Sequence, residues 1–202
     1  MAEARTIAPL VSSQWLAENS DDPGLVVIDI RTKEEYKKGH VPGALNVPFA
    51  SWATTRGELM LELADAGELF KVIGAAGIES DSRVVLVNKT DDPHEQANTT
   101  RVACTLFYAG VKNVAILDGG HNQWLREARP VSKQDVRPRP VAYKGTLDES
   151  LFVTKEYVKK RLGQSVIIDA RDPSDFFGAT QDPYSARPGH IPTAACLPAP
   201  WA

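Results

Sequence analysis

The chain has 202 residues, of which 43% are hydrophobic and 24% charged, a globular composition that excludes collagen-like, low-complexity and disordered proteins. Its 23 lysines and arginines against 26 aspartates and glutamates give a net charge of −3, so no overall basic field attracts nucleic acid or an anionic membrane. At about 150 residues per domain, the length lies between one domain and two.

The first 130 residues alternate short apolar strands with amphipathic helices. Ser12 or Ser13 is expected to cap a first helix that carries Trp15 and Leu16. We expect strands over residues 25–28, 84–87 and 114–117, and helices over residues 58–76, over residues 98–109 and from a turn at 118–120 through Trp124. Because these strands are continuous apolar runs, both their faces should be buried in a parallel sheet between helices. Residues 7–130 are therefore predicted to form one complete α/β domain.

Two sequence blocks of this domain recur later in the chain. Residues 26–31 (VVIDIR) match residues 166–171 (VIIDAR) at an offset of 140, and residues 39–44 (GHVPGA) match residues 189–194 (GHIPTA) at an offset of 150. The inserted residues fall at 178–187, whose composition is typical of a surface loop. Residues 146–202 are therefore predicted to be the N-terminal part of a second domain of the same kind.

The segment between the two copies, residues 131–145, contains two prolines and several basic residues and has no hydrophobic period. It is predicted to be an extended linker between domains. After it, Thr154 is expected to cap a helix that runs through Leu162.

Three motifs carry a resemblance to a known family. They are the Asp-x-Arg end of the strand at 25–28, the block Tyr-x-x-Gly-His-Val-Pro-Gly-Ala-x-Asn-x-Pro from Tyr36, and Asn-Val-x-x-Leu-Asp-Gly-Gly-x-x-x-Trp at 113–124. In this order they resemble the rhodanese family in its tandem two-domain form, the thiosulfate and 3-mercaptopyruvate sulfurtransferases. The resemblance implies a doubly wound parallel sheet, repeated twice. It also implies transfer of a sulfane sulfur from thiosulfate or a mercapto acid, through a cysteine persulfide, to cyanide or a thiol.

Such chemistry needs a cysteine thiolate on a strand-to-helix loop, where backbone N–H groups and a helix N-terminus stabilise negative charge. The resemblance places this cysteine at Asn88 in the first copy, and asparagine has no sulfur. The loop that follows is acidic through Asp91, Asp92 and Glu95, which would repel an anionic sulfur donor. The first domain is therefore predicted to be non-catalytic.

The matching position in the second copy would be at about 238, so the expected nucleophile lies beyond Ala202. We accordingly assign no catalytic residue within these 202 residues. The chain is interpreted as truncated or cleaved within its second domain, which the missing C-terminal polypeptide or another chain would complete.

Neither cysteine of the chain is predicted to be the nucleophile. Cys104 lies three residues after Arg101, which could activate a thiol, but its place in the middle of a helix favours a small core residue. Cys196 falls in the short strand after the second Gly-His-Ile-Pro block, away from the expected catalytic loop, and a reactive or redox thiol is the alternative there. The two cysteines also lack the spacing of a zinc site or a disulfide framework.

Several polar residues recur in both copies and are predicted to have structural roles. Asp29 and Arg31, like Asp169 and Arg171, stand at strand ends, and their recurrence favours an ion pair or strand-end hydrogen bonds over catalysis. A histidine follows the glycine of each Gly-His block, His40 in the first copy and His190 in the second. A hydrogen bond to the backbone that holds the turn is favoured over a role as base or metal ligand.

The family often holds its anionic donor with a cation on the loop after this strand of the active domain. Residues 172–175 of this chain contain no lysine or arginine, so Arg187 in the inserted loop is the candidate for substrate binding.

The first interpretation is therefore a tandem rhodanese-like sulfurtransferase whose partners are a small sulfur-containing anion and a thiol or cyanide acceptor. The alternative is a non-enzymatic rhodanese-like module that binds a partner or regulates. No metal, cofactor, nucleic acid or membrane partner is predicted. Since no apolar run has the length of a signal peptide or a membrane span, we expect a soluble protein, cytoplasmic or, if a signal was removed, periplasmic.

Overall fold

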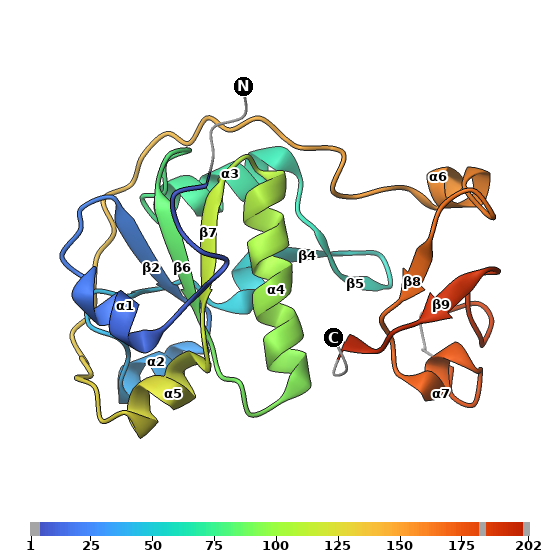
Figure 1. The fold of residues 1–202 in the computed structure, drawn as a ribbon. Coiled ribbons are helices and arrows are strands. Elements are labelled where there is room, and N and C mark those ends of the chain that lie inside the picture. Colours follow the sequence, from blue (N-terminus) through green and yellow to red (C-terminus); the bar gives the residue numbers. More distant parts are fainter. Residues whose placement is uncertain (1–4, 182–184, 200–202) are drawn as a thin grey trace. The chain divides into compact units, whose positions relative to one another are not determined.

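A computed structural model describes residues 5–181 and 185–199 of the chain (Figure 1). The chain divides into two compact units, Met1–Leu151 and Phe152–Ala202, and each is described here by itself.

A five-stranded parallel sheet forms the centre of the first unit. Its strands are β1 (Leu10–Val11), β2 (Leu25–Asp29), β3 (Leu45–Asn46), β6 (Arg83–Val87) and β7 (Asn113–Leu117), in the spatial order β1-β7-β6-β2-β3. The chain runs from β2 outward to β3 and returns to the other side of β2 with β6, which is the doubly wound arrangement. The predicted fold class is confirmed.

Helices cover both faces of this sheet. They are α1 (Ser13–Glu18), α2 (Lys33–Lys38), α3 (Ala66–Ala75), α4 (Pro93–Tyr108) and α5 (Gly120–Arg126), with a short 3-10 helix η1 (Phe49–Trp52) after β3. Side chains of β6 alternate between two cores: Val84 and Leu86 pack in the core that includes α3 and α4, and Val85 and Val87 in the core that includes α1 and α5. A strand buried on both faces explains why β6 is an uninterrupted apolar run.

The helix starts follow from side-chain capping. The Ser12 hydroxyl accepts a hydrogen bond from the backbone N–H of Trp15, as predicted for the start of α1. Thr32 and Glu35 form a reciprocal capping box at the start of α2. Asp92 caps α4, which consequently begins at Pro93, five residues earlier than the sequence indicated.

The helix predicted over residues 58–76 is wrong in its first part. Residues 53–63 form an antiparallel hairpin of β4 (Ala53–Arg56) and β5 (Leu59–Leu63), and α3 begins only at Ala66. Gly57 makes the turn between the strands with a φ of 61°, in the left-handed region that favours glycine. The apolar residues of β5 that suggested a helix face are instead largely exposed.

Residues 131–148, which we call the belt, run in extended form along the first unit, and several of their groups hydrogen-bond to it. This belt includes residues 131–145, the segment that the sequence predicts to be an extended linker. The backbone N–H of Val141 donates to the carbonyl of Gly74 at the end of α3, at 2.9 Å. The hydroxyl of Tyr143, a buried residue, donates to the carbonyl of Ala109 just after α4, at 2.7 Å. The belt therefore supplies donors to carbonyls that the ends of two helices leave without intrahelical partners.

The second unit repeats the order of β2, α2 and β3. It contains α6 (Lys155–Lys160), β8 (Ile167–Asp169), α7 (Pro173–Phe176) and β9 (Ala194–Cys196), and Thr154 caps α6 as predicted. The strands β8 and β9 pair in parallel with Asp169 opposite Cys196, just as Asp29 stands opposite Asn46 in the first unit. Residues 182–184 of the predicted surface loop lie outside the described residues.

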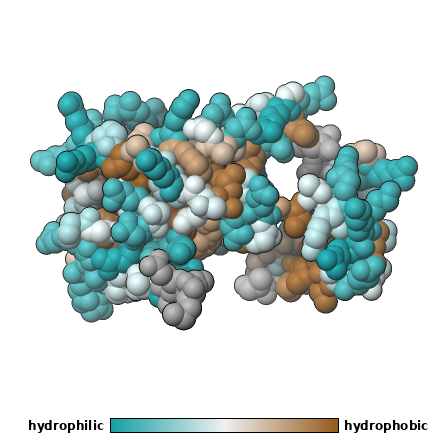
Figure 2. All heavy atoms as spheres, turned by 90° about the horizontal axis from the view of Figure 1, so that it is seen from above, coloured by the Kyte–Doolittle hydropathy of each residue, from teal (hydrophilic) through white to brown (hydrophobic). Residues whose placement is uncertain are grey.

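The second unit also leaves large apolar side chains in solvent: Val166 is 86% exposed and Phe177 is 75% exposed. Figure 2 shows the hydrophilic and apolar side chains over the surface on one side of the molecule. Within the described parts of the chain, no helix has the length and apolar character needed to cross a membrane.

Candidate functional site

The carboxyl end of β2 carries a buried ion pair between Asp29 and Arg31. The Arg31 guanidinium donates to both carboxylate oxygens, with the shortest contact, Nη2 to Oδ2, at 2.6 Å. The same Nη2 also donates to the backbone carbonyl of Gly39 at 2.9 Å. Both oxygens of the Asp29 carboxylate are bound by Arg31, so neither is free for catalysis. The bond from Arg31 to Gly39 holds the turn at that residue.

His121 joins this cluster from the first turn of α5, and sequence reasoning missed it. The Arg31 Nη1 lies 2.9 Å from His121 Nδ1, and since a guanidinium only donates, Nδ1 accepts and the neutral ring carries its proton on Nε2. Burial, followed by the charge of Arg31, lowers the pKa of His121 to about 4. The sequence feature that could have pointed to His121 is its place directly after Asp-Gly-Gly in the last motif.

His40 lies in the turn held by Arg31. Its ring stacks on Tyr36 with centroids 3.6 Å apart, Nδ1 contacts the carbonyl of Tyr36 at 2.9 Å, and Nε2 contacts the carbonyl of Gln134 in the belt at 3.2 Å. Both ring nitrogens therefore face backbone carbonyls, which leaves neither available as a base or a metal ligand.

Asn88 is buried at the end of β6, at the position where the resemblance placed a cysteine. Its Nδ2 donates to the carbonyl of Glu95 at 2.9 Å and to the hydroxyl of Thr99 at 3.1 Å, while its Oδ1 meets no hydrogen-bond partner in the described chain. The next residue, Lys89, pairs with Glu35 at 2.9 Å and with Glu95 at 3.3 Å. The loop is thus tied to α2 and α4 and offers no thiol.

The second unit builds the same strand-end geometry. Arg171 pairs with Asp169 at 2.6 Å and donates to the carbonyl of Gly189 at 2.8 Å, and hydrogen bonding to Arg171 lowers the pKa of Asp169. His190 stacks on Phe176 with centroids 3.8 Å apart and contacts its carbonyl through Nδ1 at 2.8 Å. The recurrence predicted from the two offsets therefore extends to atomic contacts.

A cavity of about 740 Å³ lies beside this second cluster. Arg171, Arg187 and His190 contribute to its lining, together with apolar residues of β8 and the turn before β9. Of the two cysteines, Cys196 is half-buried on β9. Cys104 is exposed on α4, so its assignment to the core is wrong: its neighbours Ala103 and Thr105 are buried, and Cys104 occupies the outer side of the helix.

Among residues 5–181 and 185–199, no three histidine, cysteine or acidic side chains come together as a metal ion would require.

The fold and its strand-end clusters define a doubly wound α/β domain whose central motif is duplicated in a second unit. Residues 12–127 match the family described as the rhodanese-like domain, and the chain belongs to the rhodanese family. It is 31% identical over 205 residues to a thiosulfate sulfurtransferase of Cricetulus griseus, covering 94% of this chain and 68% of that protein.

Other relatives extend this comparison. A Synechococcus elongatus protein named "Putative thiosulfate sulfurtransferase" is 30% identical over 200 residues, which is 98% of this chain and 61% of the relative. The crystal structure of SseA from Escherichia coli, among the 3-mercaptopyruvate sulfotransferases, superposes with a TM-score of 0.80 at 26% identity, covering 95% of this chain and 75% of SseA. The chain thus spans about three fifths to three quarters of these proteins.

A further structure shares the fold alone. The anaerobic ergothioneine biosynthesis enzyme of Chlorobium limicola superposes with a TM-score of 0.80 at 23% identity, over 94% of this chain and 50% of that enzyme.

Proposed function

We propose that the protein belongs to a sulfurtransferase in which the first unit is structural and a cysteine outside these 202 residues carries the sulfur. The observation that carries this proposal is that Asn88 follows β6 directly. It occupies the strand-to-helix position that the chemistry requires, it has no sulfur, and its amide nitrogen is engaged by bonds to Glu95 and Thr99. The second unit repeats the same strand-end cluster, which supports a second site of the same design.

The proposed reaction has two steps. A cysteine thiolate attacks the outer sulfur of thiosulfate, a sulfur–sulfur bond forms to the enzyme, and sulfite leaves with the electron pair of the broken bond. The resulting persulfide then transfers its terminal sulfur to cyanide, which gives thiocyanate and restores the thiolate. With a mercapto acid as donor, the thiolate attacks its sulfur, the carbon–sulfur bond breaks with its electron pair left on carbon, and a proton on that carbon releases the desulfurated acid.

The second unit supports binding of an anionic donor. Arg187 is exposed and lines the 740 Å³ cavity next to Arg171 and His190. A cation at this place would compensate for the absence of lysine and arginine in residues 172–175.

Thiocyanate formation from thiosulfate and cyanide tests the proposal. The 202-residue chain should give no more product than buffer. The gene product read past codon 202 should turn over, and serine in place of a cysteine near position 238 should abolish the turnover. Turnover by the 202-residue chain that Cys196→Ser removes, but Cys104→Ser does not, would contradict the proposal and move the nucleophile to Cys196.

A non-enzymatic binding or regulatory module is the second candidate, and the locked loop at Asn88 favours it. A stop codon directly after codon 202, with no turnover in the cell's own product, would support this module over the enzyme.

A further inference from the structure

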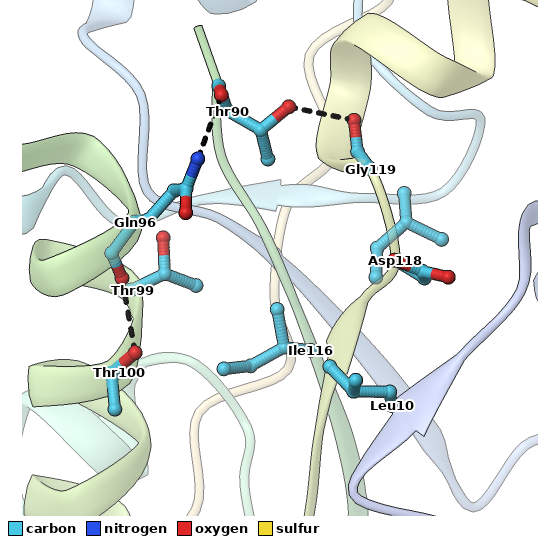
Figure 3. A pocket seen from close by; sticks show the side chains of 9 residues that line it. Leu10, Thr90, Gln96, Thr99, Thr100, Ile116, Asp118 and Gly119 are labelled. Carbon is cyan, nitrogen blue, oxygen red and sulfur yellow. Dashed lines mark hydrogen bonds between the residues drawn. The ribbon is translucent and has the colours of Figure 1, made fainter. Parts of the chain in front are cut away.

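A pocket of about 410 Å³ opens on the first unit at the carboxyl ends of β6 and β7, beside the first turns of α4 (Figure 3). In doubly wound sheets, ligands bind outside the carboxyl ends of the strands. Leu10 and Ile116 form an apolar wall, and polar side chains of the loop after β6 and of α4 form the opposite one. The volume lies within the range of small-molecule sites.

Three threonines in the lining have no hydroxyl proton to offer, and the oxygen of buried Thr99 already accepts from Asn88, so Thr90 and Thr100 are the ones with acceptor capacity left. The hydroxyls of Thr90, Thr99 and Thr100 each donate to a backbone carbonyl, at 3.0, 2.8 and 3.0 Å respectively. A hydroxyl has a single proton, so none of these three can donate to a ligand without breaking its present bond.

Gln96 completes the acceptor wall. Its Nε2 donates to the carbonyl of Thr90 at 2.9 Å, which fixes the orientation of the amide. Figure 3 shows the amide nitrogen on the Thr90 side and the amide oxygen turned toward the pocket. The oxygen Oε1 is therefore an acceptor held in place for a donor.

The side chains that line the pocket carry charge of one sign only. Among the described lining residues there is no lysine, arginine or histidine, and Asp118 lies at the rim with its carboxylate directed outward. The exposed residues Asp91 and Asp92 follow Thr90 on the same loop, whereas the neighbouring cations are Lys89, which is paired with Glu35 and Glu95, and the exposed Arg101. An acceptor-rich wall in an acidic setting disfavours anions and favours a positively charged donor.

We propose that this pocket binds a small organic cation, an ammonium or guanidinium group on a short apolar carbon chain. The cationic head would donate to Gln96 Oε1 and to the hydroxyl oxygens of Thr90 and Thr100, and the methylene groups would lie against Leu10 and Ile116. The site is separate from sulfur transfer, because no step of that reaction uses these residues, so either proposal can fail alone.

Agmatine is the probe, and 1,4-butanediol is the neutral control with the same four-carbon chain. In proton–nitrogen NMR spectra of the 202-residue chain, agmatine should shift the backbone amides of Thr90, Thr99 and Gly119 in a saturable way. Butanediol should leave them in place at the same concentration. The agmatine affinity should also fall with added salt, because the attraction is partly between charges.

Substitutions at Gln96 sharpen the test because their effects have opposite signs. Gln96→Leu removes the fixed acceptor and should weaken agmatine binding about tenfold, whereas Gln96→Glu gives up the bond to the Thr90 carbonyl but adds a negative charge and should strengthen it. Gln96 is exposed on α4, so both variants should fold. The same two substitutions at Gln134, which is exposed in the belt, are the matched controls and should leave the affinity unchanged.

Equal shifts from agmatine and butanediol would overturn the proposal. So would the absence of pocket shifts at millimolar agmatine, or Gln96 variants that bind agmatine as the original chain does.

Discussion

At the scale of single residues, the strand-end cluster combines a permanent cation with a histidine that must stay neutral. Arg31 donates to His121 Nδ1, so a proton on that nitrogen would remove the hydrogen bond and place two positive charges side by side. Burial of the ring first, and the charge of Arg31 second, lower the pKa of His121 from 6.5 to about 4. The cluster therefore makes the folded state sensitive to acid.

This sensitivity predicts a defined pH window. Above pH 6.5 the unfolded and folded states both hold His121 neutral, and the full stability is present. Between about pH 6.5 and 4 only the unfolded state takes up the proton, so the free energy of unfolding falls as the pH falls, by about 3 kcal/mol for this group. Below about pH 4 its contribution levels off.

Urea unfolding at several pH values, for the original chain and for His121→Asn, measures this contribution. Asparagine keeps an acceptor for Arg31 but does not titrate, so the variant should lose less stability between pH 6.5 and 4. Carboxylates with lowered pKa, such as Glu127 at about 2, act equally in both chains and cancel in the difference. Parallel curves for the two chains would show that His121 is not responsible.

At the scale of elements, the contact between α3 and the belt depends on a glycine. A Cβ at Gly74 would collide with the carbonyl oxygen of Val141, whereas a Cβ at Gly67 in the same helix would meet none of the described atoms within 4 Å. The same substitution should therefore have opposite effects at two positions of one helix.

Gly74→Ala should lower the free energy of unfolding by about 1–3 kcal/mol, since the belt must move away or the helix must shift. Gly67→Ala should raise it by about 0.5–1 kcal/mol, because alanine is the better helix former where space is free. Thermal unfolding of the two variants beside the original chain gives both values. A stabilised Gly74→Ala would mean that the belt is not held against α3.

The sequence predicted the buried strands β2, β6 and β7 well and missed the hairpin of β4 and β5, for reasons that lie in particular residues. The run at 84–87 is apolar throughout because β6 faces two cores, and only a buried parallel strand fits that pattern. Residues 59–63 were predicted as helix because a short apolar run has no period that separates helix from strand. The turn at Gly57 makes them the second strand of a hairpin.

The candidate site was foreseen in part. Asp29, Arg31 and Asn88 could be named because a repeat and a strand end mark them. The motif at 118–120 marks the place of His121, but its contact with Arg31 joins residues 90 positions apart, which a local pattern does not predict. Cys104 was misplaced because general burial tendencies of cysteine outweighed the helical phase of its neighbours.

At the scale of the whole molecule, the two units differ in the number of paired strands and in the size of the core that buries their backbone hydrogen bonds. The first unit has a five-stranded sheet between two cores, whereas β8 and β9 form a two-stranded sheet with exposed apolar side chains. Isolated pairs of strands are marginally stable in water. The two units should therefore open with different free energies.

Hydrogen–deuterium exchange measures this difference directly. Amides of β6 and β7 should exchange only through global unfolding of the first unit, and those of β8 and β9 should exchange faster by orders of magnitude. Protection of β8 that equals that of β6 would show that the second unit is stabilised by contacts beyond its own two strands.

The belt has a consequence for proteases. Its exposed basic residues and prolines give it the composition of a cleavable linker, yet a protease needs several residues in a freely moving chain. The hydrogen bonds at Val141 and Tyr143 withhold that freedom, and Arg137 and Arg139 each precede a proline, a bond that trypsin does not cut. In the belt, trypsin therefore finds only the bonds after Lys133 and Lys144, and the hydrogen bonds of the neighbouring backbone should slow cleavage there.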